Sequence, residues 1–131
     1  MRAPQPEPGA RGPWRVLIVD DDEDIVASLR DAFVEEGYEA LTAGDGREAL
    51  DLLLQGATRP DVVILDLVLP ILDGQHVYQA MRADPALSHI PVLVSTSSPS
   101  RAPTGAIVMP KPIELGRLLD AVNALRERGS R

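Results

Sequence analysis

Five side chains of this sequence could together bind a divalent cation and an anion beside it: Asp20, Asp21, Asp66, Thr96 and Lys111. Each lies at or just beyond the end of a short apolar run. Carboxylates that converge without a cation repel one another, and their pKa values rise. Mg²⁺ removes that cost, because it prefers oxygen ligands and typically binds one or two carboxylates together with a phosphate oxygen. The residue types therefore predict a magnesium site in which Asp20 and Asp21 are ligands and Asp66 completes the cluster.

The elements that must position these residues alternate along the chain. Short apolar runs, typical of strands covered on both faces, predict strands at 15–19, 38–42, 61–65, 92–95 and 106–109. Apolar residues at helical spacing predict helices that begin near Asp22, Asp45 and Asp73, and a last helix that contains Leu115 to Leu125. Such alternation indicates an α/β fold with a doubly wound parallel sheet, whose ligands bind at the carboxyl ends of the strands.

Three further acids, Asp22, Glu23 and Asp24, continue the acidic run that begins at Asp20. We interpret them as structural rather than as cation ligands. They fall in the first turn of the predicted first helix, where the helix dipole favours negative charge by roughly 0.3–1 kcal/mol for each exposed group.

Composition limits the classes of protein that this chain can represent. Its 131 residues suit one domain, and residues 1–13, rich in proline, are predicted to be a disordered tail or linker. The absence of cysteine excludes thiolate chemistry, and no apolar run reaches the roughly 20 residues that a membrane helix needs. A net charge of −7 argues against a nucleic-acid-binding face. We expect a cytoplasmic protein without a membrane or nucleic-acid partner.

Four stretches, "VLIVDDDEDI", "PDVVILDLVLPILDG", "PVLVSTSS" and "PKP", resemble the motifs of response regulator receiver domains, the phosphoacceptor modules of two-component signalling. The resemblance covers about residues 14–127 and leaves 128–131 as a C-terminal tail. It implies a flavodoxin-like sheet of five parallel strands in the order 2-1-3-4-5.

The resemblance also implies a metal set. Asp20, Asp21 and Asp66 would hold Mg²⁺, together with the backbone carbonyl of Val68. Mg²⁺ is the cofactor that the resemblance implies.

A phosphoryl set is implied as well. Asp66 would accept a phosphoryl group from the phosphohistidine of a histidine kinase or a histidine phosphotransfer protein. Lys111 would pair with the phosphoryl oxygens, and the Thr96 hydroxyl and the Ser97 backbone N–H would hydrogen-bond them. The resemblance further implies a cis bond between Lys111 and Pro112.

The chain departs from the family pattern in three places. Only nine residues, Ser97 to Gly105, lie between Thr96 and Ala106, where the fifth predicted strand begins. A crossover with a helix needs at least about 10–12 residues, so we expect the fourth helix to be absent or reduced to one turn. Val108 replaces the usual aromatic residue three positions before Lys111. In the family, the side chains two residues after the phosphoacceptor Asp and two residues after the Thr influence hydrolysis of the acyl phosphate. Here they are Val68 and Ser98, which offer no acid or amide to orient an attacking water, so we expect slow hydrolysis.

These departures leave alternatives open. The chain could be a scaffold that kept the acidic pocket but works without phosphorylation, because Val108 cannot make the usual aromatic switch. It could also be an aspartyl-nucleophile phosphatase, although that class carries a second Asp where this chain has Val68. The leading hypothesis is a phosphorylation-switched module, not an enzyme in the ordinary sense, that acts as a monomer or weak homodimer on an unknown downstream protein.

Overall fold

The computed structural model describes residues 12–56 and 59–129. Five strands form one parallel sheet: β1 (Arg15–Val19), β2 (Glu39–Ala43), β3 (Val62–Asp66), β4 (Val92–Thr96) and β5 (Ile107–Pro110). Four α-helices accompany them: α1 (Glu23–Glu35), α2 (Gly46–Leu54), α3 (Gly74–Ala83) and α4 (Leu115–Gly129). The strand order is β2-β1-β3-β4-β5, as the family resemblance implies. The predicted doubly wound α/β fold is confirmed.

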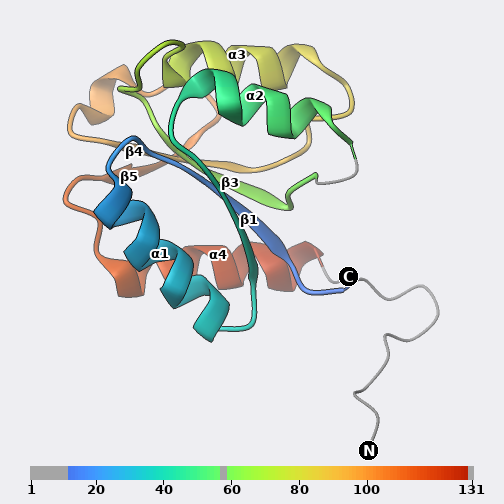
Figure 1. Ribbon diagram of the computed structural model, residues 1–131, viewed down its shortest axis with the longest axis vertical. Helices are drawn as coiled ribbons and strands as arrows, with labels where there is room; N and C mark the ends of the chain where they lie inside the picture. Colours follow the sequence, from blue (N-terminus) through green and yellow to red (C-terminus); the bar gives the residue numbers. More distant parts are fainter. Residues whose placement is uncertain (1–11, 57–58, 130–131) are drawn as a thin grey trace, which may run out of the picture.

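The helices cover both faces of the sheet, as Figure 1 shows: α2 and α3 lie above it and α1 and α4 lie below. Each face has its own apolar core. Leu17, Val19 and Leu65 belong to the core under α2 and α3, whereas Ile18 and Ile64 belong to the core under α1 and α4. Both faces are buried, which explains why the strands appear in the sequence as continuous apolar runs.

Three helices begin at an aspartate whose carboxylate accepts backbone N–H groups of the first turn. Asp22 accepts from the backbone N–H groups of residues 24 and 25, Asp45 from that of Glu48, and Asp73 from that of His76. Asp22 is therefore the cap of α1 rather than part of its first turn. Such caps typically contribute about 1 kcal/mol each.

The fourth crossover contains a single 3₁₀ turn, Pro99–Arg101, and no α-helix, which confirms the prediction from its length. Side chains of α3 hold it in place. Gln75 Nε2 donates to the carbonyl oxygen of Arg101 at 2.7 Å, and the Tyr78 hydroxyl donates to that of Thr104 at 3.1 Å. Arg82 Nε in turn donates to the Tyr78 hydroxyl at 2.9 Å. The short loop thus lies on α3 through hydrogen bonds to its backbone.

The ends of the chain differ in part from the predicted boundaries. Residues 1–11 of the predicted tail lie outside the described residues. At the other end, α4 continues to Gly129, two residues past the predicted domain boundary. A Cβ on Gly129 would lie 2.9 Å from the Trp14 ring, so this last turn packs on the start of the domain. Arg128 and Gly129 therefore belong to the helix and not to a tail.

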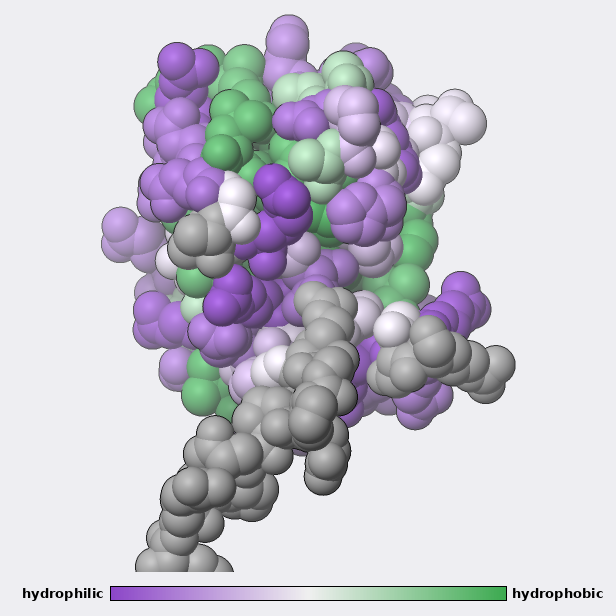
Figure 2. All heavy atoms as spheres, turned by 90° about the vertical axis from the view of Figure 1, so that its right-hand side faces the viewer, coloured by the Kyte–Doolittle hydropathy of each residue, from purple (hydrophilic) through white to green (hydrophobic). Residues whose placement is uncertain are grey.

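Figure 2 shows the side of the molecule that lies on the right in Figure 1. Hydrophilic residues cover most of this surface. Among the described residues, no helix is both long and apolar enough to cross a membrane.

Candidate acidic phosphoacceptor site

Three carboxylates meet at the carboxyl ends of β1 and β3. Asp20 and Asp21 follow β1, and Asp66 is the last residue of β3. Carboxylate oxygens of the three lie within 4.8 Å of one another. Asp20 and Asp66 are only 5% and 4% exposed, whereas Asp21 is open to solvent. The structure thus brings together the three carboxylates that the sequence proposed as one cluster.

Asp20 carries the clearest electrostatic signature of the cluster. Burial raises its pKa above the usual 3.8, and the charges of Asp66 and Asp21 raise it further. A hydrogen bond from the backbone N–H of Asp22, 2.9 Å from Asp20 Oδ1, and the charge of Lys111 oppose this rise without cancelling it. The site thus groups three carboxylates with one nearby ammonium, and this set of oxygen ligands fits a hard divalent cation.

Lys111 lies across the pocket from Asp20. Its Nζ donates to Asp66 Oδ2 at 2.9 Å, and 31% of the Lys111 side chain is exposed. Burial alone would lower the pKa of this ammonium, but the hydrogen bond and the charge of Asp66 outweigh burial and raise it above 10.5. Its backbone N–H donates to the Thr96 carbonyl at 2.9 Å, and the following bond to Pro112 is cis, as the resemblance implied.

Asp66 has both carboxylate oxygens engaged. Oδ2 accepts from Lys111, and Oδ1 accepts from the backbone N–H of Val68 at 3.0 Å. The loop beyond it closes through a second backbone bond, from the N–H of Gly74 to the carbonyl of Leu67, at 2.9 Å. This geometry fixes the direction of the carboxylate before any partner arrives.

Thr96 ends β4 and is 5% exposed. Its Oγ1 accepts a hydrogen bond from the backbone N–H of Ser98 at 2.9 Å, which stabilises the turn at the start of the crossover. A hydroxyl that accepts can still donate its own proton to a phosphoryl oxygen. Ser97 lies exposed beside it at the start of the short crossover.

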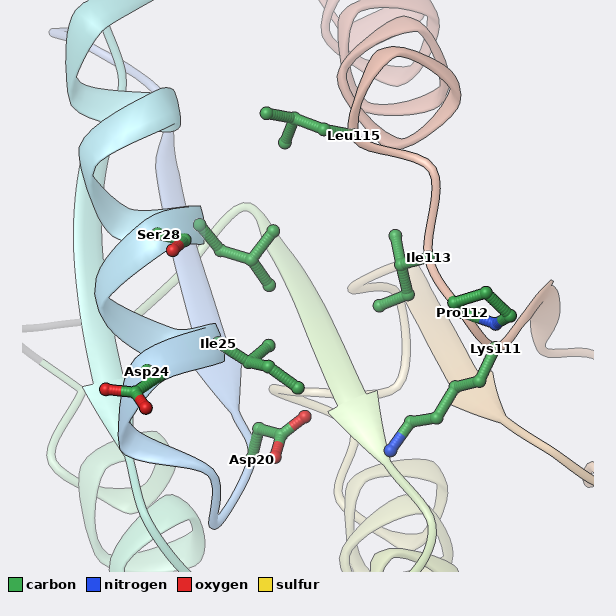
Figure 3. Close-up of a pocket in the computed structure, with 9 residues that line it drawn as sticks. Asp20, Asp24, Ile25, Ser28, Lys111, Pro112, Ile113 and Leu115 are labelled. Atoms are coloured by element: carbon green, nitrogen blue, oxygen red, sulfur yellow. The ribbon is translucent and has the colours of Figure 1, made fainter.

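A cleft of about 420 Å³ opens between the acidic residues and the start of α4 (Figure 3). Lys111 and Asp20 point toward each other at one end of it. The rest of its lining is mainly apolar and includes Ile25, Ile113 and Leu115. The charged site therefore adjoins an apolar surface of α1 and the loop before α4.

Comparison with known sequences decides the family. Residues 16–123 match the response regulator receiver domain. The chain belongs to the response regulator receiver family. It is 40% identical to the response regulator MprA of Mycolicibacterium vanbaalenii over 121 residues, which cover 88% of this chain and 52% of that protein. It is also 40% identical to the transcriptional regulatory protein PrrA of Mycobacterium tuberculosis over 122 residues, with the same coverage. This receiver thus spans about half the length of the curated relatives it matches.

Solved structures agree with that assignment. The receiver domain of the Francisella response regulator 1452 matches with a TM-score of 0.76 and 28% identity, covering 88% of this chain and 98% of that one. The chemotaxis response regulator CheY4 of Vibrio cholerae matches with a TM-score of 0.75 and 30% identity, covering 86% of this chain and 98% of that one. This chain is therefore a receiver domain of the kind found in two-component response regulators.

Proposed function

We propose that Asp66 accepts a phosphoryl group from the phosphohistidine of a histidine kinase or a histidine phosphotransfer protein. The observation that carries this proposal is the position of Asp66. It is a nearly buried carboxylate within 4.8 Å of two others, and an ammonium lies 2.9 Å from its Oδ2. Membership of the receiver family supports the same role.

In the proposed transfer, an oxygen of the ionised Asp66 carboxylate attacks phosphorus while the phosphorus–nitrogen bond of the donor breaks. The imidazole leaves with the bonding electron pair and takes up a proton, and an acyl phosphate remains on Asp66. The Lys111 ammonium moves from the Asp66 carboxylate to a phosphoryl oxygen and stabilises its negative charge. The Thr96 hydroxyl and the Ser97 backbone N–H hydrogen-bond the same group.

Mg²⁺ would bind to Asp20, Asp21, Asp66 and the Val68 carbonyl, and it would neutralise charge on the phosphoryl oxygens. The cluster of three carboxylates supports this assignment, and so does the raised pKa of Asp20, which burial causes first and the charges of Asp66 and Asp21 increase.

The phosphodonor protein is proposed to dock on the apolar cleft beside the site. Ile25, 38% exposed, and Leu115, 41% exposed, offer apolar surface next to Asp20 and Lys111. A protein seated there would exclude water from the reacting atoms.

We place this chemistry in the cytoplasm, where histidine kinases present their phosphohistidine. The downstream partner is proposed to be a protein that distinguishes the phosphorylated form from the unphosphorylated form.

The test is phosphorylation by acetyl phosphate, followed by intact mass spectrometry. The wild-type protein is expected to gain the mass of one phosphoryl group when Mg²⁺ is present and to gain none when the metal is chelated. Asp66→Asn should gain none in either condition. Asp51→Asn, at an exposed position on α2, is the matched control and should behave as wild type. An unmodified wild-type protein, or a modified Asp66→Asn protein, would refute the proposal.

The short crossover is proposed to carry the response, since it begins directly after Thr96. Thr96 Oγ1 accepts from the Ser98 N–H, so a movement of Thr96 toward a phosphoryl oxygen would be passed to the crossover, whose backbone Gln75 and Tyr78 hold on α3. We expect hydrogen exchange across residues 97–105 to change when beryllofluoride and Mg²⁺ are added. Exchange in α2 provides the internal reference. Unchanged protection in 97–105 would contradict this response.

The acyl phosphate is expected to be long-lived, because Val68 and Ser98 do not orient an attacking water. Val68 is 76% exposed, so replacing it should not disturb folding. Val68→Asn is expected to shorten the phosphorylated lifetime about 3- to 10-fold by placing an amide beside the phosphoryl group. Loss of the mass adduct over time measures this. Val34→Asn, on exposed α1, should leave the lifetime unchanged.

A phosphorylation-independent scaffold is the second candidate, and Val108 is the observation that favours it. This residue is only half-buried on β5 and cannot swing as an aromatic side chain does. A scaffold would bind its partner equally well as wild type, as Asp66→Asn and with beryllofluoride. A phosphatase finds little support, because the position of its second Asp holds Val68.

A further inference from the structure

Ser95, the residue before Thr96, stands out among the buried polar groups. It is 2% exposed, and its Oγ has no hydrogen-bond partner among the described residues. A buried hydroxyl without a partner is destabilising, so each such group calls for an explanation.

The strand register places Ser95 beside the phosphoacceptor. Asp66 and Ser95 are Cα partners in the β3–β4 ladder. Side chains alternate along a strand, so Asp66 shares a face with Ile64 and Ser95 shares a face with Leu93. Ile64 and Leu93 both lie in the core under α1 and α4. Asp66 and Ser95 therefore stand side by side on that face of the sheet.

The ion pair of the site crosses over the same position. Lys111 follows β5, Asp66 ends β3, and β4 lies between these two strands. The 2.9 Å contact between Lys111 Nζ and Asp66 Oδ2 must therefore span β4. Ser95 is the β4 residue that is paired with Asp66 on one side and with Met109 on the other. A small side chain at Ser95 leaves room for the lysine to reach across.

We propose that Ser95 is a positioning residue for Lys111, whose ammonium donates a hydrogen bond to Ser95 Oγ once Asp66 is phosphorylated. Acyl phosphate formation turns the carboxylate that Lys111 pairs with in the resting state into an ester-like group, so the ammonium must move to the phosphoryl oxygens. The ammonium has three N–H donors and can donate to Ser95 Oγ while it also donates to the phosphoryl group. Ser95 Oγ, buried beneath its path, is the acceptor at hand. The hydroxyl holds the ammonium over the phosphoryl group instead of letting it return to solvent.

This inference rests on the proposed phosphorylation of Asp66, and an isosteric pair of variants tests it. Thr and Val side chains have nearly the same shape and volume. Ser95→Thr keeps the hydroxyl group, whereas Ser95→Val has a methyl group in its place. Phosphorylation by acetyl phosphate is followed at saturating Mg²⁺ over a range of donor concentrations. We expect the Thr variant to approach wild type. The Val variant, and Ser95→Ala, should lose about 3- to 10-fold in maximal rate, with little change in the donor concentration at half-maximal rate.

A double-mutant cycle separates positioning from a structural role. In a Lys111→Met background, the Thr and Val variants of Ser95 should phosphorylate at equal rates, because the group that the hydroxyl positions is gone. Ser88→Ala, in the turn after α3, is the control for removing a serine hydroxyl elsewhere and should match wild type.

The possible failures differ from one another. Equal rates for the Thr and Val variants, or a Thr–Val difference that persists without Lys111, would overturn the role of Ser95 while leaving Asp66 as the phosphoacceptor. A wild-type protein that gains no phosphoryl group would instead overturn the proposed function on which the inference rests.

Discussion

Gly74→Ala is expected to destabilise the protein by about 3 kcal/mol or more and to impair phosphorylation of whatever protein remains folded. A Cβ on Gly74 would lie 2.3 Å from the carbonyl oxygen of Asp66 and 2.7 Å from Cα of Leu67. Both are backbone atoms, so no side-chain rotation relieves the clash. Either α3 or the end of β3 must move, and the end of β3 carries Asp66, the proposed phosphoacceptor.

Urea unfolding with and without the substitution measures this effect, and acetyl phosphate measures the chemistry. Gly116→Ala is the matched control. Its Cβ would meet nothing within 4 Å, and Gly116 lies in the first turn of α4. Alanine there should be neutral or add up to about 1 kcal/mol, because it restricts the unfolded chain and favours the helix. Equal stability of the Gly74→Ala and wild-type proteins would contradict the close packing of α3 on Asp66.

Asp20→Asn is expected to have opposite effects on stability and on metal binding. Without metal, the substitution removes a buried charge from between Asp66 and Asp21, while an amide oxygen can still accept the Asp22 N–H. The metal-free protein should gain on the order of 1 kcal/mol, the usual size of a single-substitution effect. Its Mg²⁺ affinity should fall at least about tenfold, because affinity follows the number of charged oxygen ligands. Calorimetric titration and thermal melting measure the two effects.

The pH dependence follows from the direction of the Asp20 shift. The pKa of this carboxyl is higher in the folded protein than its ordinary 3.8, so the folded state binds the proton more tightly than the unfolded chain does. The contribution of Asp20 to the stability of the metal-free wild type should therefore fall as pH rises from about 3.8 through the raised pKa. Asp20→Asn should lack this loss.

Asp21→Asn is the comparison that isolates burial. Asp21 contributes to the same cluster but is exposed. Its substitution should weaken Mg²⁺ binding, while the metal-free protein gains less stability than Asp20→Asn does. If Asp20→Asn lowered metal-free stability instead, the buried carboxylate would be a structural group and not a strained metal ligand.

Much of the fold could be predicted because both faces of the sheet are buried. The inner strands β1, β3 and β4 consist mainly of apolar residues, and β2 and β3 begin within one residue of the predicted positions. The helix starts were equally visible, since Asp22, Asp45 and Asp73 cap them through local hydrogen bonds. The missing fourth helix followed from the nine residues that lie between Thr96 and Ala106. These features depend on local spacing and therefore appear in the sequence.

The candidate site was predicted only as a set of residues at one sheet edge. The packing of α1 decides that Asp20 is buried while Asp21 is exposed. The path of the chain after β5 decides that Lys111 bonds to Asp66 rather than to solvent. The sequence also gave no sign that α3 side chains hold the short crossover, because Gln75 and Tyr78 carry no motif.

By itself the sequence determined the order of strands and helices, the carboxylates at the ends of β1 and β3, and the loss of the fourth helix, because spacing and hydrophobic pattern are local properties. Only the tertiary structure decided that Gly74 must lack a side chain and that Ser95 is paired with Asp66 across the β3–β4 ladder. Those facts arise where separate elements of the fold approach one another closely, and a single chain's residue pattern does not encode such approaches directly.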